Sequence, residues 1–163
     1  MRILVLLIVL LVLSLTGYAL YSVRTSTHDP ELWHVNPLTV PPQPSPNGYR
    51  VADPEMTDYA VDRPAPIYAG DAGVIATAFD TFVMGQPRIE KIAGSVEDRW
   101  ITYVQRTEAL RFPDYISVRF IDLEGTGTST VAIFSRSRYG YGDMGVNQQR
   151  VDAWLKALES FEE

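Results

Sequence analysis

The chain has 163 residues, enough for one domain, and a formal net charge of −6. Without Arg2 and Arg24, which flank an apolar N-terminal stretch, 12 basic residues remain against 20 acidic ones. An acidic domain repels phosphate backbones and anionic lipid headgroups, so nucleic acid is not an expected partner. The chain has no cysteine and only two histidines, which excludes disulfides, thiolate chemistry and cysteine metal centres. We expect no cofactor and no metal site.

An uncharged stretch runs from Ile3 to Val23. A bilayer core of about 30 Å needs about 20 helical residues, so this stretch is long enough to span a membrane. Its milder second half also suits a signal peptide, with Gly17 and Ala19 as the small residues before cleavage. Because the apolar run continues to Val23, we predict a transmembrane anchor at 1–24, with a signal peptide as the alternative. The short basic head and the acidic remainder favour a domain outside the cytoplasm.

A proline-rich segment follows at 25–66 and holds nine of the eleven prolines. Proline fixes φ and lacks a donor N–H, so we expect this segment to be extended rather than regular helix or central strand. Three large aromatic residues within it, and a fourth directly after it, are not needed in a purely solvated linker: Trp33, Tyr49, Tyr59 and Tyr68. We therefore expect the segment to lie along the surface of the domain.

The remainder, 67–163, has the pattern of an α+β domain. Asp71 is a good N-cap for a first amphipathic helix that ends at Gly85. Four strand-like runs follow, at 88–93, 100–106, 115–123 and 130–138. Their short connections favour antiparallel neighbours, and Asn147 stands where an N-cap of the final helix belongs. We predict a single antiparallel four-stranded sheet with two helices packed on one face, preceded by an N-terminal transmembrane helix.

The densest group of polar and glycine residues lies at 135–150. Here the sequence resembles the bacterial domain-of-unknown-function family 1499, whose signature reads Arg-Ser-x-Ser-Arg-x-Gly-x-x-Asp-x-Gly-x-Asn-x-x-Arg. Eight residues match it in register: Ser135, Ser137, Arg138, Gly140, Asp143, Gly145, Asn147 and Arg150. The first arginine of the signature falls on Phe134, and the family's Pro-Asn-Cys falls on Pro46-Asn47-Gly48, so that thiol is absent. The resemblance covers the chain from about Asp29 onward and implies a small envelope-associated α+β module without a known activity.

Five residues of this motif are candidate binding residues: Arg136, Arg138, Asp143, Asn147 and Arg150. In a structural interpretation, Arg138 and Arg150 pair with Asp143 while Asn147 caps the helix. In a functional interpretation, the same cations and the N–H groups of the helix start bind a phosphate or carboxylate. Ion-pair networks imitate binding sites, so the sequence leaves both interpretations open.

Other chemistries have weaker support, and we predict no catalytic residue. Ser135 and Ser137 have no nearby base, because both histidines lie about a hundred residues upstream. Nothing in the sequence places two carboxylates together for glycoside chemistry; the loop candidates are Asp98, Glu108, Asp114 and Asp122. Four aromatic residues near strand ends are candidates for contact with a sugar or a partner, with ordinary packing as the alternative: Phe112, Tyr115, Tyr139 and Tyr141.

These observations predict an uncharacterised, membrane-anchored envelope module that is not an enzyme and that binds a partner protein or an anionic group. The alternative is a hydrolase that acts on envelope material through carboxylates. The resemblance implies a single-pass protein of the bacterial inner membrane with its domain on the periplasmic side. The membrane itself, an envelope protein or an anionic ligand are therefore the expected partners.

Overall fold

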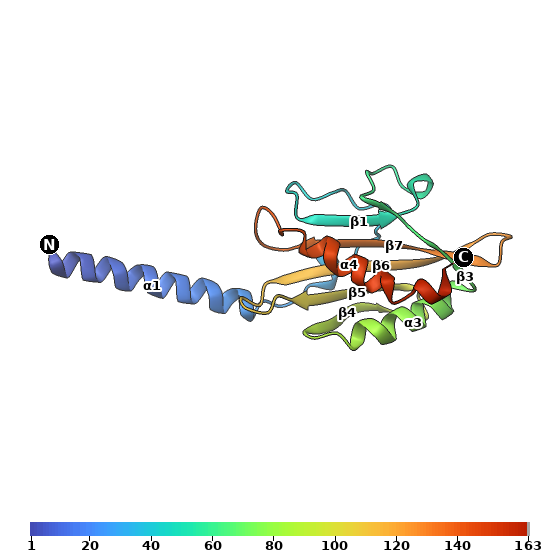
Figure 1. Cartoon of the computed structure of the whole chain (residues 1–163). Helices are drawn as coiled ribbons and strands as arrows, with labels where there is room; N and C mark the ends of the chain where they lie inside the picture. Colours follow the sequence, from blue (N-terminus) through green and yellow to red (C-terminus); the bar gives the residue numbers. More distant parts are fainter. Residues whose placement is uncertain (163) are drawn as a thin grey trace.

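The structure is a computed structural model that describes residues 1–162. Helix α1 (Arg2–Arg24) projects from the folded part of the chain, and none of its residues is buried (Figure 1). Among the described residues it is the one helix long and apolar enough to cross a membrane, and its N-terminal position also fits a signal sequence. The predicted apolar N-terminal helix is thus confirmed.

All four predicted strands are present, with slightly different ends. They are β4 (Ile89–Ser95), β5 (Trp100–Arg106), β6 (Pro113–Leu123) and β7 (Thr128–Ser137). Each is antiparallel to the next, and β6 and β7 pair over ten residues. This hairpin forms the centre of the sheet, because its strands are the longest and are paired on both sides.

The sheet has seven strands, so the predicted four-stranded sheet is wrong. Three further strands come from residues before the first predicted helix: β1 (Gly48–Ala52), β2 (Arg63–Pro64) and β3 (Ile67–Ala69). The order is β2-β1-β7-β6-β5-β4, with β3 paired to the start of β7 and β2 parallel to β1. Pro46 and Pro54 flank β1 rather than interrupt it, and Pro64 lies on an edge strand, where proline removes no necessary hydrogen bond.

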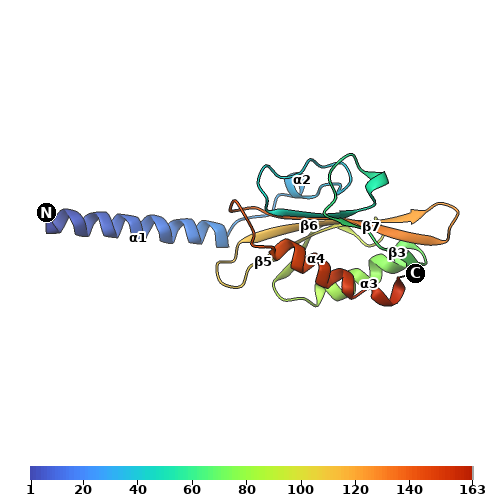
Figure 2. The ribbon, with the colours of Figure 1, turned by 45° about the horizontal axis from the view of Figure 1, so that its top comes forward.

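Helices α3 (Ala72–Met84) and α4 (Val146–Lys156) lie together on one face of the sheet (Figure 2). As predicted, Asp71 caps α3 by accepting a hydrogen bond of 2.7 Å from the Gly73 N–H. Phe79 of α3 and Trp154 of α4 meet edge to face with centroids 5.8 Å apart, over core residues from five strands. The described residues also contain three short helical turns that were not predicted: α2 (Pro30–Trp33), η1 (Pro54–Met56) and η2 (Glu159–Phe161).

The opposite face of the sheet is covered by residues 25–47, which we call the strap. Trp33 of the strap stacks on Tyr115 of β6 with ring centroids 3.7 Å apart, and His34 stacks on Trp100 of β5 at 4.0 Å. Trp100 Nε1 also donates to the Val35 carbonyl at 3.1 Å. The expected surface segment is therefore packed onto a sheet face, which hides the second side of the central strands.

Candidate functional site

The five candidate residues do not form one cluster, because they lie on both faces of the sheet. Along β7 the side chains alternate, so Arg136 and Arg138 point toward the strap while Ser135 points toward the helices. Asp143 and the two α4 residues, Asn147 and Arg150, lie on the helix side with Ser135. The motif therefore divides into two separate polar groups.

The helix-side group is organised around Arg150, whose side chain is buried. Its Nη2 donates to Asp114 Oδ2 at 2.5 Å, and the two side chains are only 6% and 4% exposed. Nε donates to Gln105 Oε1 at 2.6 Å, and Nη1 donates to Asn147 Oδ1 at 2.7 Å. The expected pairing of Arg138 and Arg150 with Asp143 is wrong, because β6 brings Asp114 under α4.

Asp143 instead fixes the start of α4. Its Oδ2 accepts hydrogen bonds from the backbone and side-chain amides of Asn147 at 2.8 and 2.7 Å, and Oδ1 accepts one from the Gly145 N–H at 3.1 Å. Gly145, with φ of 78°, occupies the N-cap position, and Asn147 is the second helical residue. The prediction of Asn147 as N-cap is therefore wrong: the carboxylate four residues earlier satisfies the first N–H groups.

Asn147 also joins the helix start to β1 and β7. Its Nδ2 donates to the Asn47 carbonyl at 3.0 Å and to Ser137 Oγ at 3.1 Å, while Asn47 Nδ2 donates to the Gly140 carbonyl at 2.8 Å. Asn47 belongs to the Pro46-Asn47-Gly48 segment noted in the sequence. These buried amides explain why the two segments, a hundred residues apart, share one polar network.

The strap-side group begins with Arg136, which holds the strap over β7. Its guanidinium carbon lies 5.0 Å from the Trp33 ring centroid, and Nη2 donates to the Leu32 and Trp33 carbonyls at 3.3 and 3.4 Å. Burial lowers the pKa of Arg136 to about 10, so the side chain remains a cation at neutral pH. The buried cation is stabilised by ring faces and carbonyl oxygens.

Arg138 completes this group at the edge of the strap. Its Nη1 donates to the Thr27 carbonyl at 3.1 Å and to the Tyr115 hydroxyl at 3.3 Å. Arg106 Nη2 lies 3.0 Å from His28 Nε2, and His28 Nδ1 lies 2.9 Å from the same Tyr115 hydroxyl. Because arginine only donates, this geometry requires a neutral imidazole that accepts at Nε2 and donates from Nδ1.

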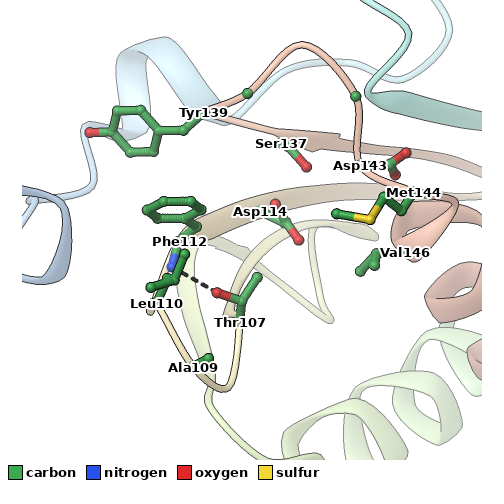
Figure 3. A pocket seen from close by; sticks show the side chains of 12 residues that line it. Thr107, Ala109, Leu110, Phe112, Asp114, Ser137, Tyr139, Asp143, Met144 and Val146 are labelled. Carbon is green, nitrogen blue, oxygen red and sulfur yellow. Dashed lines mark hydrogen bonds between the residues drawn. The ribbon is translucent and has the colours of Figure 1, made fainter. Parts of the chain in front are cut away.

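An open pocket of about 310 Å³ lies beyond the helix-side group, between the loop 107–112 and the loop 139–146 (Figure 3). Leu110, Phe112 and Met144 line its mouth, while Asp114 and Asp143 reach it from the polar network. Phe112 and Tyr139 lie 5.9 Å apart between ring centroids on one wall. A pocket of this size, apolar with a few polar groups, is typical of ligand sites.

The two loops that line this pocket lie at the end of the domain from which α1 departs (Figure 1). Arg24 Nη2 donates to the Ala109 carbonyl at 3.4 Å, and Arg106 Nη1 donates to the Val23 carbonyl at 3.2 Å. The last residues of α1 therefore contact the loop that forms one wall of the pocket. The turn between β6 and β7 lies at the other end of the sheet.

The arrangement suits binding better than nucleophilic catalysis. Ser135 Oγ donates to Asn147 Oδ1 at 2.6 Å and is buried, and both histidines belong to the strap on the opposite face. Asp114 and Asp143 both line the pocket, but each already accepts hydrogen bonds from N–H groups of the fold. No three metal-binding side chains gather anywhere within residues 1–162.

Sequence reasoning missed three participants of the helix-side group and its pocket: Asn47, Gln105 and Leu110. Asp114 was considered only as a loop carboxylate, although it begins β6. The sequence did hold a signal for Asp114. Arg150 lies in the second turn of a helix that packs on the sheet, so it needs an acidic partner, and Asp114 is an acidic residue near the start of a strand. The aromatic residues Phe112 and Tyr139, by contrast, were candidates for ligand contact and do line the pocket.

Comparison with known proteins supports the resemblance seen in the motif. A search of curated protein sequences gave no match. The family model described as "Protein of unknown function (DUF1499)" matches residues 38–158, which include β1, the whole sheet, both packed helices and the motif. The match begins after α1 and most of the strap. The chain therefore belongs to the DUF1499 family.

Proposed function

We propose that this protein is a non-catalytic binding module, held by α1 in the bacterial inner membrane with its domain on the periplasmic side. Its ligand or partner occupies the pocket between the loops 107–112 and 139–146. The observation that carries this proposal is the position of the pocket, whose wall is hydrogen-bonded to the last turn of the candidate membrane span. A pocket in that position binds a ligand or partner that is located at the membrane surface.

The chemistry of the motif supports binding at the pocket rather than at the motif itself. Arg150 and Asn147 are buried and hydrogen-bond within the fold, and Arg136 is buried with its Nη2 donating to carbonyls of the strap. Of the five candidates, Asp143 lines the pocket, and Arg138 is half-buried near the Tyr139 side of it. The motif thus builds the floor of the pocket, and the two loops provide its contact surface.

Site-specific photo-crosslinking in native membranes tests this proposal. A p-benzoylphenylalanine at Tyr141, next to the pocket, is expected to form a defined adduct, while one at Val74, an exposed residue of α3, is expected to form none. Filling the pocket by Ala109→Phe should remove the Tyr141 adduct. Adducts that are equal at both positions, or that persist in Ala109→Phe, would contradict the proposal.

A carboxylate hydrolase remains a second candidate because Asp114 and Asp143 line the same pocket. Paired carboxylates at a suitable separation cleave glycosidic bonds. The test is release of soluble sugar from isolated envelope material by the purified full-length chain. Activity that disappears in Asp143→Asn, in protein that is still folded at the assay temperature, would favour the hydrolase over the binding module.

A further inference from the structure

We infer that the end of the domain next to α1 is a lipid-contact surface that docks on the phospholipid bilayer in which α1 is anchored. Apolar side chains of the two pocket loops reach the boundary between the headgroups and the acyl chains, and nearby arginines pair with lipid phosphates. The inference deepens the proposed function and rests on it in taking α1 as a membrane span. The pocket mouth then opens toward lipid, so its ligand comes from the membrane surface.

Four apolar or aromatic side chains project from the two loops and are exposed. We call them the rim, and they are Leu110, Tyr141, Met144 and Val146. Met144 is 96% exposed and Tyr141 is 80% exposed. Exposure of a methionine side chain to water gives no gain in stability. Single exposed apolar residues are common, but a group of them around one opening marks an interaction surface. Tyrosine among them is typical of membrane interfaces.

The position of α1 identifies what covers the rim. The apolar run of α1 ends at Val23, whose carbonyl accepts a hydrogen bond from Arg106. Arg24, the next residue, donates to the carbonyl of Ala109, which immediately precedes Leu110 of the rim. If Val23 lies at the membrane boundary, the loop 107–112 lies at the same level. Both loops therefore face the headgroup layer, and no further segment is needed to bring the rim to lipid.

The charges around the rim differ from those of the whole domain. Four arginines gather at this end: Arg24, Arg106, Arg111 and Arg138. Carboxylates of the same region that are exposed or half-buried include Asp29, Glu90, Glu108 and Asp143. The acidic average of the chain opposes contact with anionic lipid, but charges separated by more than a Debye length of about 8–10 Å are largely screened. The contact therefore depends on the cations nearest the membrane, and Arg24 and Arg111 are exposed enough to reach lipid phosphates.

Brominated lipids test this inference, because they quench a fluorophore that touches acyl chains. The chain has no cysteine, so single labels are placed at Gly142→Cys, where an added Cβ meets nothing within 4 Å, and at Glu124→Cys in the distal turn. The full-length protein is reconstituted in vesicles of phosphatidylcholine with phosphatidylglycerol. The label at 142 is expected to be quenched strongly, and the label at 124 is expected to be unaffected.

Matched variants distinguish contact between the rim and lipid from attachment to the membrane by α1 alone. Leu110→Ser with Met144→Ser should abolish the quenching at 142, whereas Val74→Ser, at an exposed apolar residue on α3, should not change it. Arg111→Gln should lower the ratio of docked to undocked protein about fivefold, whereas Arg119→Gln, exposed on β6, should leave it unchanged. Omitting phosphatidylglycerol should reduce the docking of the unchanged protein.

Equal quenching at the two labels, or quenching at 142 that ignores the rim substitutions, would overturn the inference. The outcome also separates it from the proposed function. The label at 142 could stay unquenched while the photo-crosslinker at Tyr141 still forms a pocket-dependent adduct to a protein. That result would show that the rim binds a partner protein rather than lipid. Loss of both signals would remove the proposed function as well.

Discussion

Arg150 of α4 and Asp114 at the start of β6 form a buried ion pair, with Nη2 2.5 Å from Oδ2. The pair lies under the pocket and joins the last helix to the central hairpin of the sheet. Gln105, Asn147 and Ser135 accept the remaining hydrogen bonds of the guanidinium. A charge removed from water this completely is tolerated only when its partners are in place, so the pair reports directly on the integrity of the motif.

We therefore expect Arg150→Met to lower the free energy of unfolding by about 3–5 kcal/mol, because Asp114 is left buried without its cation. The measurement is denaturant unfolding of the full-length protein in detergent, followed by tryptophan fluorescence. The double variant Arg150→Met with Asp114→Leu should recover much of the loss, since no charge then remains unpaired.

The control for this prediction is the ion pair between Arg63 and Asp152, which is partly exposed at 2.7 Å. Arg63→Met should cost no more than about 1 kcal/mol, because solvent screens an exposed pair. If Arg150→Met is as mild as the control while the protein loses its photo-adduct at Tyr141, the arginine is a binding residue and the structural account of the motif is wrong.

Asp143 gives a second prediction, through the start of α4. Asp143→Ala removes the acceptor for two backbone N–H groups and for the Asn147 amide, so we expect a loss of about 1–2 kcal/mol. Asp143→Asn should retain part of that stability, because an amide oxygen still accepts one or more of these bonds. Hydrogen exchange at the amides of Gly145 and Asn147 provides the local readout, and unchanged protection in Asp143→Ala would refute the capping role.

The strap gives a third prediction. Trp33→Ala removes the stack on Tyr115 and the contact with Arg136, so we expect a loss of about 1–3 kcal/mol and faster proteolysis within residues 25–47. The neighbouring Leu32 is 66% exposed, and Leu32→Ala should stay within about 0.5 kcal/mol of the unchanged protein. Equal protease sensitivity of the two variants would mean that the strap is not held by Trp33.

The two histidines of the strap give a fourth prediction. Burial, and secondarily Arg106, lowers the pKa of His28, and burial lowers the pKa of His34. The unfolded chain therefore binds protons that the folded chain resists, so stability is full above the unfolded pKa of about 6.5 and falls as the pH drops below it. Protonation of His28 at Nε2 would also remove its hydrogen bond from Arg106.

The test compares unfolding midpoints at about pH 7.5 and about pH 5.5 for the unchanged protein and for His28→Gln with His34→Gln. The unchanged protein should lose more stability on acidification than the double variant, because carboxylate titration is common to both. A larger acid loss in the double variant would reverse the sign and contradict the assignment of neutral histidines.

Local patterns predicted much of the fold. The apolar run predicted α1, Asp71 predicted the start of α3, and four strand-like runs predicted β4, β5, β6 and β7. What failed was the proline-rich segment. Its prolines dominate the composition, yet the proline-free run Gly48–Ala52 forms a strand. It pairs with the edge of β7 that faces away from β6, where the backbone groups of β7 need hydrogen-bond partners. Such pairing depends on which edge lies next to the segment in space, and spacing along the chain does not contain that information.

The candidate site was predictable in its residues but not in its partners. The motif pointed to Arg150, Asn147 and Asp143, and all three are part of one network. The partner of Arg150 lies 36 residues earlier, where only the register between β6 and β7 brings it beneath the helix. The register of β7 likewise sends Arg136 and Arg138 to the opposite face, which separates them from the other three.

We propose that α1 holds the folded domain outside the cytoplasm as an uncleaved anchor. The direct measurement is labelling of Glu124→Cys in spheroplasts with a membrane-impermeant maleimide, followed by fractionation. We predict that the intact, unprocessed chain is labelled from outside and is recovered with the membranes. Unprocessed chain in the soluble cytosolic fraction, labelled only after lysis, would contradict the claim, and so would a labelled product that has lost residues 1–24.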